Sequence, residues 1–410
     1  MSTILAYTSP AIGHLFPMTP LLLELARRGH DVHVRTLPER VGTLRDLGLH
    51  AAPIDPAVQD VRHHDWTARG ARAALHHAAA VFGERGRVDA PDLARALDEV
   101  RPDAVVVDIN CWGAAAAAEA WGGPWATFSP YVPALTSPGT PPFGPGVAPL
   151  SGPLGRARDA VLRRLVLGAV EGTMLPPLNA LRREVGVEAV GTADEMFRRA
   201  PLMLVTTAKP FEYATTDWGP DVVMVGACPW EPPQATPDWL HAVDAPVVLV
   251  TTSSEFQDDG VLVRTALDAL ADEAVHVVAT LPAGGPAPVV PRNATVVDFV
   301  PHGPVLERAV VAVTHGGMGA TQKALARGIP VCVVPFGRDQ HEVARRVEVS
   351  GAGTRLPAKR LRADRLREAV RTARTLTAGA ERVARGYAAA GGAATGADAV
   401  EQRLLVGLTT

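Results

Sequence analysis

The stretch THGGMGATQKALARGIP, residues 314–330, places three glycines within four residues, between an apolar run and a segment of good helix formers. The preceding run AVVAVT, residues 309–314, is short and β-branched, which predicts a buried parallel strand. The segment ATQKALARG predicts a helix that stops at Gly328. Glycines at such a corner leave backbone N–H groups that aim at an anion over the helix start. The corner therefore indicates a phosphate site, with an ordinary tight turn as the alternative.

The length and composition of the chain limit the class of protein to which this glycine corner can belong. A chain of 410 residues is long enough for two domains, and its net charge of −3 gives no basic excess for nucleic acid. The amino terminus has no basic region typical of a signal peptide, and no apolar run reaches about 18 residues, so neither secretion nor membrane spanning is expected. Cys111, Cys228 and Cys332 show no disulfide or metal spacing, which suits a cytoplasmic protein.

Strand-like and helix-like segments alternate along the whole chain, which predicts an α/β fold with two doubly wound, Rossmann-like domains facing across a cleft. A proline-rich stretch without periodicity separates two such blocks. We expect a first domain over residues 1–227, a linker over 228–243 and a second domain over 244–390. For the remaining residues, 391–410, we expect a C-terminal helix that packs back on the first domain.

Other nucleotide-binding motifs are missing from the sequence. The first strand-to-helix corner reads TSPAIGHLFP, with the single Gly13 where a dinucleotide site needs three glycines. Neither a P-loop nor a D-x-D motif occurs, so no metal is expected to hold a diphosphate. Backbone N–H groups and His315 would then have to neutralise it.

Residues 314–353 combine H-G-G-x-G, a G-I-P strand entry and an Asp-Gln pair after the next strand. This compound motif resembles the donor-binding signature of inverting glycosyltransferases of the GT-B fold, which use nucleotide sugars to modify antibiotics, macrolides and plant natural products. The segment GHLFPMTPLLLELARRGHDV is similar to the opening of the same family. The resemblance covers essentially the whole chain, with an acceptor domain first and a donor domain second.

The resemblance assigns a catalytic pair in the first domain. His14 would be the general base that takes the proton of an acceptor hydroxyl, and Asp108 would orient it and stabilise its imidazolium form. A loop or capping role is the alternative for His14, and capping of the next helix is the alternative for Asp108. The acceptor pocket is expected to include Ile12, Trp66, Trp112, Phe128 and Phe143, although core packing is the alternative for the aromatic residues.

The donor residues implied by the resemblance fall into three groups. The diphosphate would be bound by His315, Gly316, Gly317, Gly319, Thr321, Ser253 and Ser254, the nucleoside by Val300, His302, Gln322 and Lys323, and the donor sugar by Asp339 and Gln340.

Two donor-side residues depart from the family pattern. Lys323 stands where many relatives carry a glutamate for the ribose, and a cation cannot accept hydroxyl protons. Either Gln322 takes the ribose, or Lys323 adds charge beside the diphosphate, or stacking and the glycine corner hold the nucleotide. His302 replaces a common glutamine. These changes leave the donor, UDP- or dTDP-linked, open.

We therefore expect an inverting glycosyltransferase that acts on a hydroxyl of a hydrophobic small molecule such as a polyketide, as a monomer or homodimer and without a metal. A nucleotide-sugar epimerase and a silent nucleotide-sugar-binding protein are the alternatives. The histidine doublets at residues 63–64 and 76–77 match no common metal-ligand set. The acceptor segments 60–87 and 130–154 are expected to be irregular.

Overall fold

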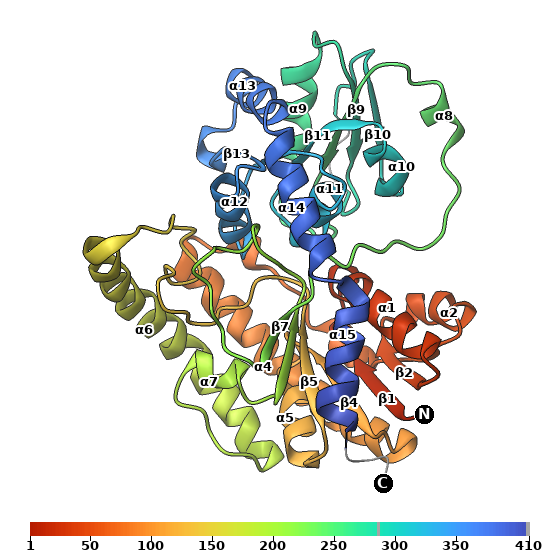
Figure 1. Ribbon diagram of the computed structural model, residues 1–410, viewed down its shortest axis with the longest axis vertical. Coiled ribbons are helices and arrows are strands. Elements are labelled where there is room, and N and C mark those ends of the chain that lie inside the picture. The colour runs from red at the N-terminus through yellow and green to blue at the C-terminus, as the bar shows by residue number, and fades with distance from the viewer. Residues whose placement is uncertain (285–287, 407–410) are drawn as a thin grey trace.

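The computed structural model describes residues 1–284 and 288–406. Two parallel β-sheets, each covered by helices on both faces, form two domains (Figure 1). The expected α/β fold of two doubly wound sheets is confirmed. The last four residues of the expected C-terminal helix, 407–410, lie outside the described residues.

The first sheet has the order β3-β2-β1-β4-β5-β6-β7, with every pairing parallel. Its strands are β1 (Thr3–Tyr7), β2 (Asp31–Thr36), β3 (His50–Pro53), β4 (Ala104–Asp108), β5 (Trp125–Ser129), β6 (Leu202–Val205) and β7 (Val222–Met224). The helical segments of this half are α1 (Ile12–Arg27), α2 (Pro38–Asp46), α3 (Pro56–Asp60), η1 (Asp65–Thr67), α4 (Ala71–Val100), α5 (Trp112–Trp121), α6 (Gly152–Val185) and α7 (Ala193–Phe197).

The second sheet has the order β10-β9-β8-β11-β12-β13 and is also parallel throughout. Its strands are β8 (Val247–Thr251), β9 (His276–Thr280), β10 (Ala294–Val297), β11 (Ala309–Thr314), β12 (Val331–Val333) and β13 (Gly353–Arg355). The helical segments of this half are α8 (Asp238–His241), α9 (Val261–Leu270), α10 (His302–Leu306), α11 (Met318–Leu325), α12 (Gln340–Val349), η2 (Ala358–Arg360), α13 (Ala363–Arg374), α14 (Thr377–Ala389), α15 (Gly392–Val400) and η3 (Glu401–Leu405).

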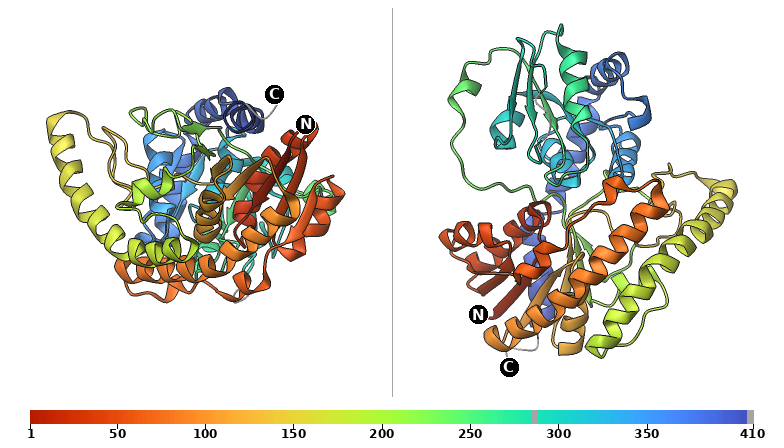
Figure 2. Two further views of the ribbon diagram at one scale, coloured as in Figure 1. Left: turned by 90° about the horizontal axis from the view of Figure 1, so that it is seen from below. Right: turned by 180° about the vertical axis from the view of Figure 1, so that it is seen from behind.

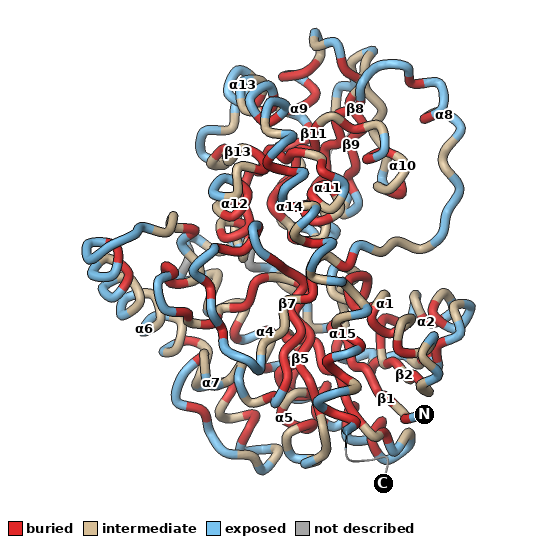
Figure 3. Tube along the Cα trace, in the orientation of Figure 1, coloured by how far each residue is buried: buried red, intermediate tan, exposed pale blue. Residues whose placement is uncertain are grey.

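The central strands of both sheets are apolar on both faces, because helices cover both sides. In β4 and β8 all the residues are buried (Figure 3). In the first domain α1, α2 and α15 pack on one face, while α4 and α5 pack on the other, and the long helices α4 and α6 lie side by side (Figure 2). In the second domain α9 and α13 cover one face, and α10, α11, α12 and α14 cover the other.

The chain returns to the first domain at its end. α14 lies on the second domain, and α15 then packs against α1 and contributes Ala397 and Val400 to the core of the first sheet (Figure 1). One apolar cluster also spans both domains and contains Val205 and Phe211 from the first together with Val247 and Ala344 from the second. The two domains therefore share buried apolar surface besides the polar contacts described below.

One expectation about the first domain is wrong. Residues 60–87 were expected to be irregular, but α4 begins at Ala71 and runs to Val100. Alanines and charged residues with good helix propensity continue through this segment, and they outweigh the interrupting histidines and Gly83. The second segment expected to be irregular, 130–154, contains no helix or strand over 130–151, but α6 begins within it at Gly152.

Gly113 tests the packing that supports the end of β4. A Cβ atom at Gly113, on α5, would lie 1.9 Å from the carbonyl oxygen of Gly86 on α4. We expect Gly113→Ala to lower stability by about 1–3 kcal/mol, because the two helices would have to separate. The urea midpoint measures this, with Gly42→Ala in α2 as the control, since a Cβ there meets nothing within 4 Å. A Gly113→Ala midpoint equal to that of Gly42→Ala would contradict the packing argument.

Candidate active site

His14 and Asp108 meet at the carboxyl edge of the first sheet. His14 lies in the first turn of α1, just after β1, and Asp108 is the last residue of the neighbouring β4. The His14 Nδ1 atom lies 2.7 Å from Asp108 Oδ2, and the carboxylate is fully buried while the imidazole keeps 16% of its surface exposed. The parallel pairing of β1 and β4 thus brings together two residues that are 94 positions apart.

Two residues that the sequence did not indicate, Asn110 and Tyr131, determine which nitrogen of the neutral His14 ring carries no proton. Tyr131 donates its hydroxyl to Asn110 Oδ1 at 2.7 Å, which leaves the Asn110 amide nitrogen 3.2 Å from His14 Nε2. The amide N–H donates to Nε2, and Nδ1–H donates to Asp108. The lone pair of His14 therefore lies on Nε2, away from Asp108.

The surroundings of His14 favour its protonated form. Burial alone would lower the pKa of His14, but the charge and hydrogen bond of Asp108, with the carboxylates of Glu255 and Asp339, raise it above its ordinary value. Glu255 and Asp339 belong to the second domain, so residues of both domains set the basicity of this imidazole. A raised pKa suits a group that must gain a proton during a reaction.

The glycine corner lies where the sequence predicted it, between β11 and α11. Gly316 has φ +96°, and a Cβ at Gly317 would lie 2.4 Å from His315 Nε2, so a side chain at either position is disfavoured. The α11 amino end carries no side-chain cap, and the space over Gly319 is open. His315 is buried and its Nδ1 atom has no hydrogen-bond partner within the described parts of the chain. Burial lowers the pKa of His315, so the ring is neutral and has one N–H donor and one acceptor nitrogen.

The remaining residues expected at the diphosphate differ in their access to it. Ser253 is buried after β8, where its N–H donates to Asp259 at 2.8 Å, and Ser254 is exposed. Thr321 is fully buried, and its hydroxyl lies 3.3 Å from that of Thr314. Thr321 therefore stabilises the corner from within, and we do not propose it as a phosphate ligand.

On the nucleoside side the structure changes the expected roles. Gln322 is buried, and its amide nitrogen donates to the backbone carbonyl of Thr206, just after β6, so this nitrogen is used in a contact with the other domain. Lys323 Nζ lies 2.7 Å from Oε1 of Glu231, a linker residue. Val300 is buried in the shared apolar cluster. Glu231 also accepts the backbone N–H of His302 at 3.0 Å.

Gln340 is the first residue of α12 and Asp339 is its N-cap residue, after a turn in which Arg338 has a left-handed φ of 53°. Burial raises the pKa of Asp339, although Arg338 and His14 oppose this. The Gln340 side chain accepts the N–H groups of Phe336 and Gly337 and donates to Gln257 at 2.8 Å. Gln340 thus shapes the turn that presents Asp339, and its amide has its hydrogen bonds within the protein.

The expected acceptor residues separate into two groups. Trp66 is 43% exposed, and its ring meets Phe256 of the second domain edge-on at a centroid distance of 5.0 Å. Ile12 and Phe143 are partly buried. Trp112 and Phe128 are 3% and 1% exposed, so both pack in the interior, and the expectation that they line an acceptor pocket is wrong.

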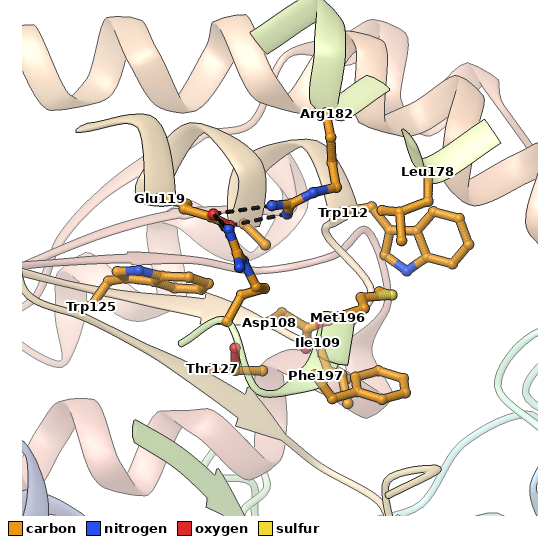
Figure 4. Close-up of a pocket in the computed structure, with 12 residues that line it drawn as sticks. Asp108, Ile109, Trp112, Glu119, Trp125, Thr127, Leu178, Arg182, Met196 and Phe197 are labelled. Carbon is orange, nitrogen blue, oxygen red and sulfur yellow. Dashed lines mark hydrogen bonds and ion pairs between the residues drawn. The ribbon is translucent and has the colours of Figure 1, made fainter. Parts of the chain in front are cut away.

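Figure 4 shows the surroundings of Trp112. Its ring lies beside Leu178 and close to Met196, near the ion pair of Glu119 with Arg182, in which the charged atoms are 3.0 Å apart. The cavity that these residues border with Asp108 has a volume of about 20 Å³. Such a volume holds a single water molecule rather than an organic acceptor.

A buried ion cluster joins the acceptor side to the donor side. Arg346 on α12 donates to Glu212 of the first domain at 2.7 and 3.0 Å and to Glu342 at 2.8 Å. The other Glu342 oxygen accepts the N–H groups of Gly144 and Gly146, each at 2.8 Å. The helix that carries Asp339 therefore also holds the irregular segment 130–151 of the first domain.

One group of side chains has metal-ligating atoms close together. In it Asp31 accepts from His33 and His50, each at 3.1 Å, and the two imidazoles stack. The cluster lies on β2 and β3, and Asp31 begins β2, so it is at the opposite end of the strands from His14. No helix within the described residues is long and apolar enough to cross a membrane.

Comparison with known proteins adds independent information. Residues 264–400 match the family model of the erythromycin biosynthesis protein CIII-like C-terminal domain. The chain is 33% identical over 389 residues to 4′-demethylrebeccamycin synthase of Lentzea aerocolonigenes, with 90% of each protein covered. It is 31% identical over 287 residues to a PGL/p-HBAD biosynthesis glycosyltransferase of Mycobacterium tuberculosis (strain ATCC 25177 / H37Ra), with 67% of this chain and 64% of the relative covered.

Solved structures share the fold. The glycotransferase of kitacinnamycin superposes with a TM-score of 0.76 at 25% identity, covering 98% of this chain and 99% of the other. The calicheamicin glycosyltransferase CalG4 gives a TM-score of 0.73 at 24% identity over 99% of both chains. A spinosyn rhamnosyltransferase complexed with thymidine diphosphate gives 0.71 at 19% identity, covering 98% and 100%.

Glu342 provides a test of the link between α12 and the acceptor side. In Glu342→Ala the N–H groups of Gly144 and Gly146 lose their acceptor, so we expect hydrogen–deuterium exchange in residues 143–147 to accelerate roughly tenfold or more. Val349→Ala, on the same helix but 47% exposed, is the matched control and should leave the exchange unchanged. Equal exchange in the two variants would show that another contact holds the segment.

Proposed function

Because this chain belongs to the family of natural-product glycosyltransferases, we propose that it transfers a sugar from a nucleotide sugar to a hydroxyl of a hydrophobic small molecule, with inversion and with His14 as general base. The observation that carries the proposal is the hydrogen bond of His14 Nδ1 to the buried Asp108, beside the second domain. It leaves Nε2 as the basic nitrogen and keeps the imidazole in one orientation.

The proposed reaction is a single displacement. The acceptor hydroxyl takes the place of the Asn110 amide at His14 Nε2 and gives its proton to that nitrogen. The hydroxyl oxygen then forms a bond to the anomeric carbon of the sugar, while the bond from that carbon to the diphosphate breaks. The diphosphate leaves with the electron pair, and Asp108 stabilises the imidazolium ion that forms.

The glycine corner is proposed to stabilise the leaving group. Within the described residues, no side chain caps the N–H groups of the first α11 turn, and the Nδ1 atom of His315 has no hydrogen-bond partner. These polar groups would stabilise the negative charge that develops on the diphosphate, so the proposed reaction needs no metal ion. Asp339, presented by the turn before α12, is proposed to accept hydrogen bonds from the donor sugar.

The relatives indicate the classes of donor and acceptor. A spinosyn rhamnosyltransferase has been solved with thymidine diphosphate and with the spinosyn aglycone, so we propose a dTDP- or UDP-linked sugar and an aglycone-type acceptor. The exposed pair of Trp66 and Phe256 offers apolar surface for such an acceptor. The activities named for the relatives favour transfer over epimerisation or silent binding.

Replacing His14 tests the proposed base. We expect His14→Ala to lower kcat by roughly 10² to 10⁴ while the affinity for the nucleoside diphosphate stays the same, because the base acts on the acceptor and not on the diphosphate. Turnover with a panel of aglycones and calorimetric binding of thymidine diphosphate and uridine diphosphate measure the two effects. His30→Ala, a histidine that pairs with Glu401 away from the site, is the control. If His14→Ala lost nucleotide binding but kept its kcat, the assignment of His14 as the general base would be wrong.

A further inference from the structure

The linker residue Glu231 forms the centre of a polar cluster between α10 and α11. Its Oε1 atom accepts from Lys323 Nζ at 2.7 Å and from the His302 N–H at 3.0 Å, and its Oε2 atom accepts from the Gly303 N–H at 3.0 Å. The side chains of Glu231 and Lys323 are each 16% exposed. The linker thus places one carboxylate against the second domain, close to Lys323 on α11.

This carboxylate keeps unused acceptor capacity. Two carboxylate oxygens offer about four lone-pair directions, and the three hydrogen bonds above occupy three of them. Burial would raise the pKa of Glu231, but Lys323 and the His302 N–H lower it, so the group is ionised. The Nδ1 atom of His302 is also buried and has no hydrogen-bond partner among the described residues. Burial and Lys323 lower the pKa of His302 to about 4, so this imidazole is neutral and one of its nitrogens accepts.

The cluster lies in the direction that the nucleoside end of a donor must take. With the diphosphate over the first turn of α11, the sugar must point toward His14, and the nucleoside must extend away from it. Lys323 is six residues beyond Gly317, about 9 Å along the helix axis. The nucleoside sugar is joined to the diphosphate through a single carbon atom, so with the diphosphate at the proposed position it would lie near this part of α11.

Of the other polar groups there, neutral His302 offers one acceptor nitrogen, and the rest supply no charged acceptor for a hydroxyl of the nucleoside sugar. Gln322 donates to Thr206 across the domain interface, and an ammonium group such as that of Lys323 has no lone pair. A buried hydroxyl without an acceptor would weaken binding, since each such group loses its bond to water.

We propose that Glu231, supplied by the linker, is the ribose-binding carboxylate of this protein, and that Lys323 is the positioning residue that holds it against α10 and α11. This inference rests on the proposed function, because it takes a nucleoside diphosphate at the glycine corner as given. The charge of Lys323 then serves the linker rather than the diphosphate.

The neighbouring residue gives this contact a second consequence. Trp230 packs edge-on against Phe16 of α1 at a centroid distance of 5.1 Å, so adjacent linker residues contact the two domains. A ribose bound to Glu231 therefore also fixes the linker at the point where it leaves the acceptor domain. Donor binding and domain position are coupled through two consecutive residues.

The test removes either partner of the proposed hydrogen bond and measures binding by calorimetry. Thymidine diphosphate, whose deoxyribose has a single 3′-hydroxyl, is compared with its 3′-deoxy form, and uridine diphosphate with its 2′,3′-dideoxy form, in the unmodified protein and in Glu231→Ala. We expect loss of the hydroxyls to weaken binding to the unmodified protein roughly tenfold or more for the diphosphate that binds, and to have no further effect in Glu231→Ala. Glu231→Gln, which keeps an oxygen acceptor, should restore part of the loss.

Two controls separate the carboxylate from a general disturbance of the linker. Glu307→Ala removes an exposed acid at the end of α10 and should leave the hydroxyl dependence intact. A linker defect would weaken both forms of the ligand equally in Glu231→Ala, and that result would overturn the assignment of Glu231 while the proposed function stands. If the unmodified protein bound neither diphosphate, and His315→Ala changed nothing, the donor site itself would be refuted together with this inference.

Discussion

The buried guanidinium of Arg346 is the interaction on which the arrangement of the two domains most depends. It joins Glu212 of the first domain to Glu342 of the second, and all three side chains are almost completely inaccessible to water. Such a charge is tolerated in the interior only when its hydrogen bonds are complete, and removal of one partner typically costs about 3–5 kcal/mol. Since Glu342 also binds the segment around Gly144, one helix sets both the domain contact and the acceptor side.

This arrangement separates two kinds of electrostatic environment. His14 lies among the carboxylates of Asp108, Glu255 and Asp339, which favour the positive charge it would gain. The first turn of α11 offers N–H dipoles, which favour the negative charge that a diphosphate would gain. The proposed proton acceptor and the proposed leaving-group site therefore favour opposite charges and belong to different domains, which suits the proposed single displacement.

The sequence was most informative where local pattern and chemistry coincide. The glycine corner and the alternating strands and helices follow from local sequence pattern. The pair of His14 and Asp108 came from the family resemblance, and the parallel pairing of β1 and β4 explains why the two residues meet at one edge of the sheet. Glu231 could not be found in this way, because a linker glutamate has no periodic pattern and its partner is 92 positions away. The one sequence feature that indicated such an acid was Lys323, a cation where the family pattern has a glutamate.

Other misses have the same physical origin. Gln322 was expected at a nucleoside, but it reaches the carbonyl of Thr206, a contact between domains that spacing along the chain does not reveal. Trp112 and Phe128 were expected at an acceptor, yet the helices over the first sheet bury both. An aromatic residue near a strand end is equally compatible with core and pocket, and only the tertiary packing decides between them.

The central claim is that His14, oriented by Asp108, accepts the acceptor proton, and the pH dependence of kcat/KM tests it most directly. A base must be neutral to act, so activity should fall as the pH drops through the pKa of His14. Asp108 raises that pKa, so in Asp108→Asn the acidic limb should move to lower pH while the plateau rate decreases. An acidic limb that stays in place, or moves to higher pH, would show that another group titrates and would contradict the account.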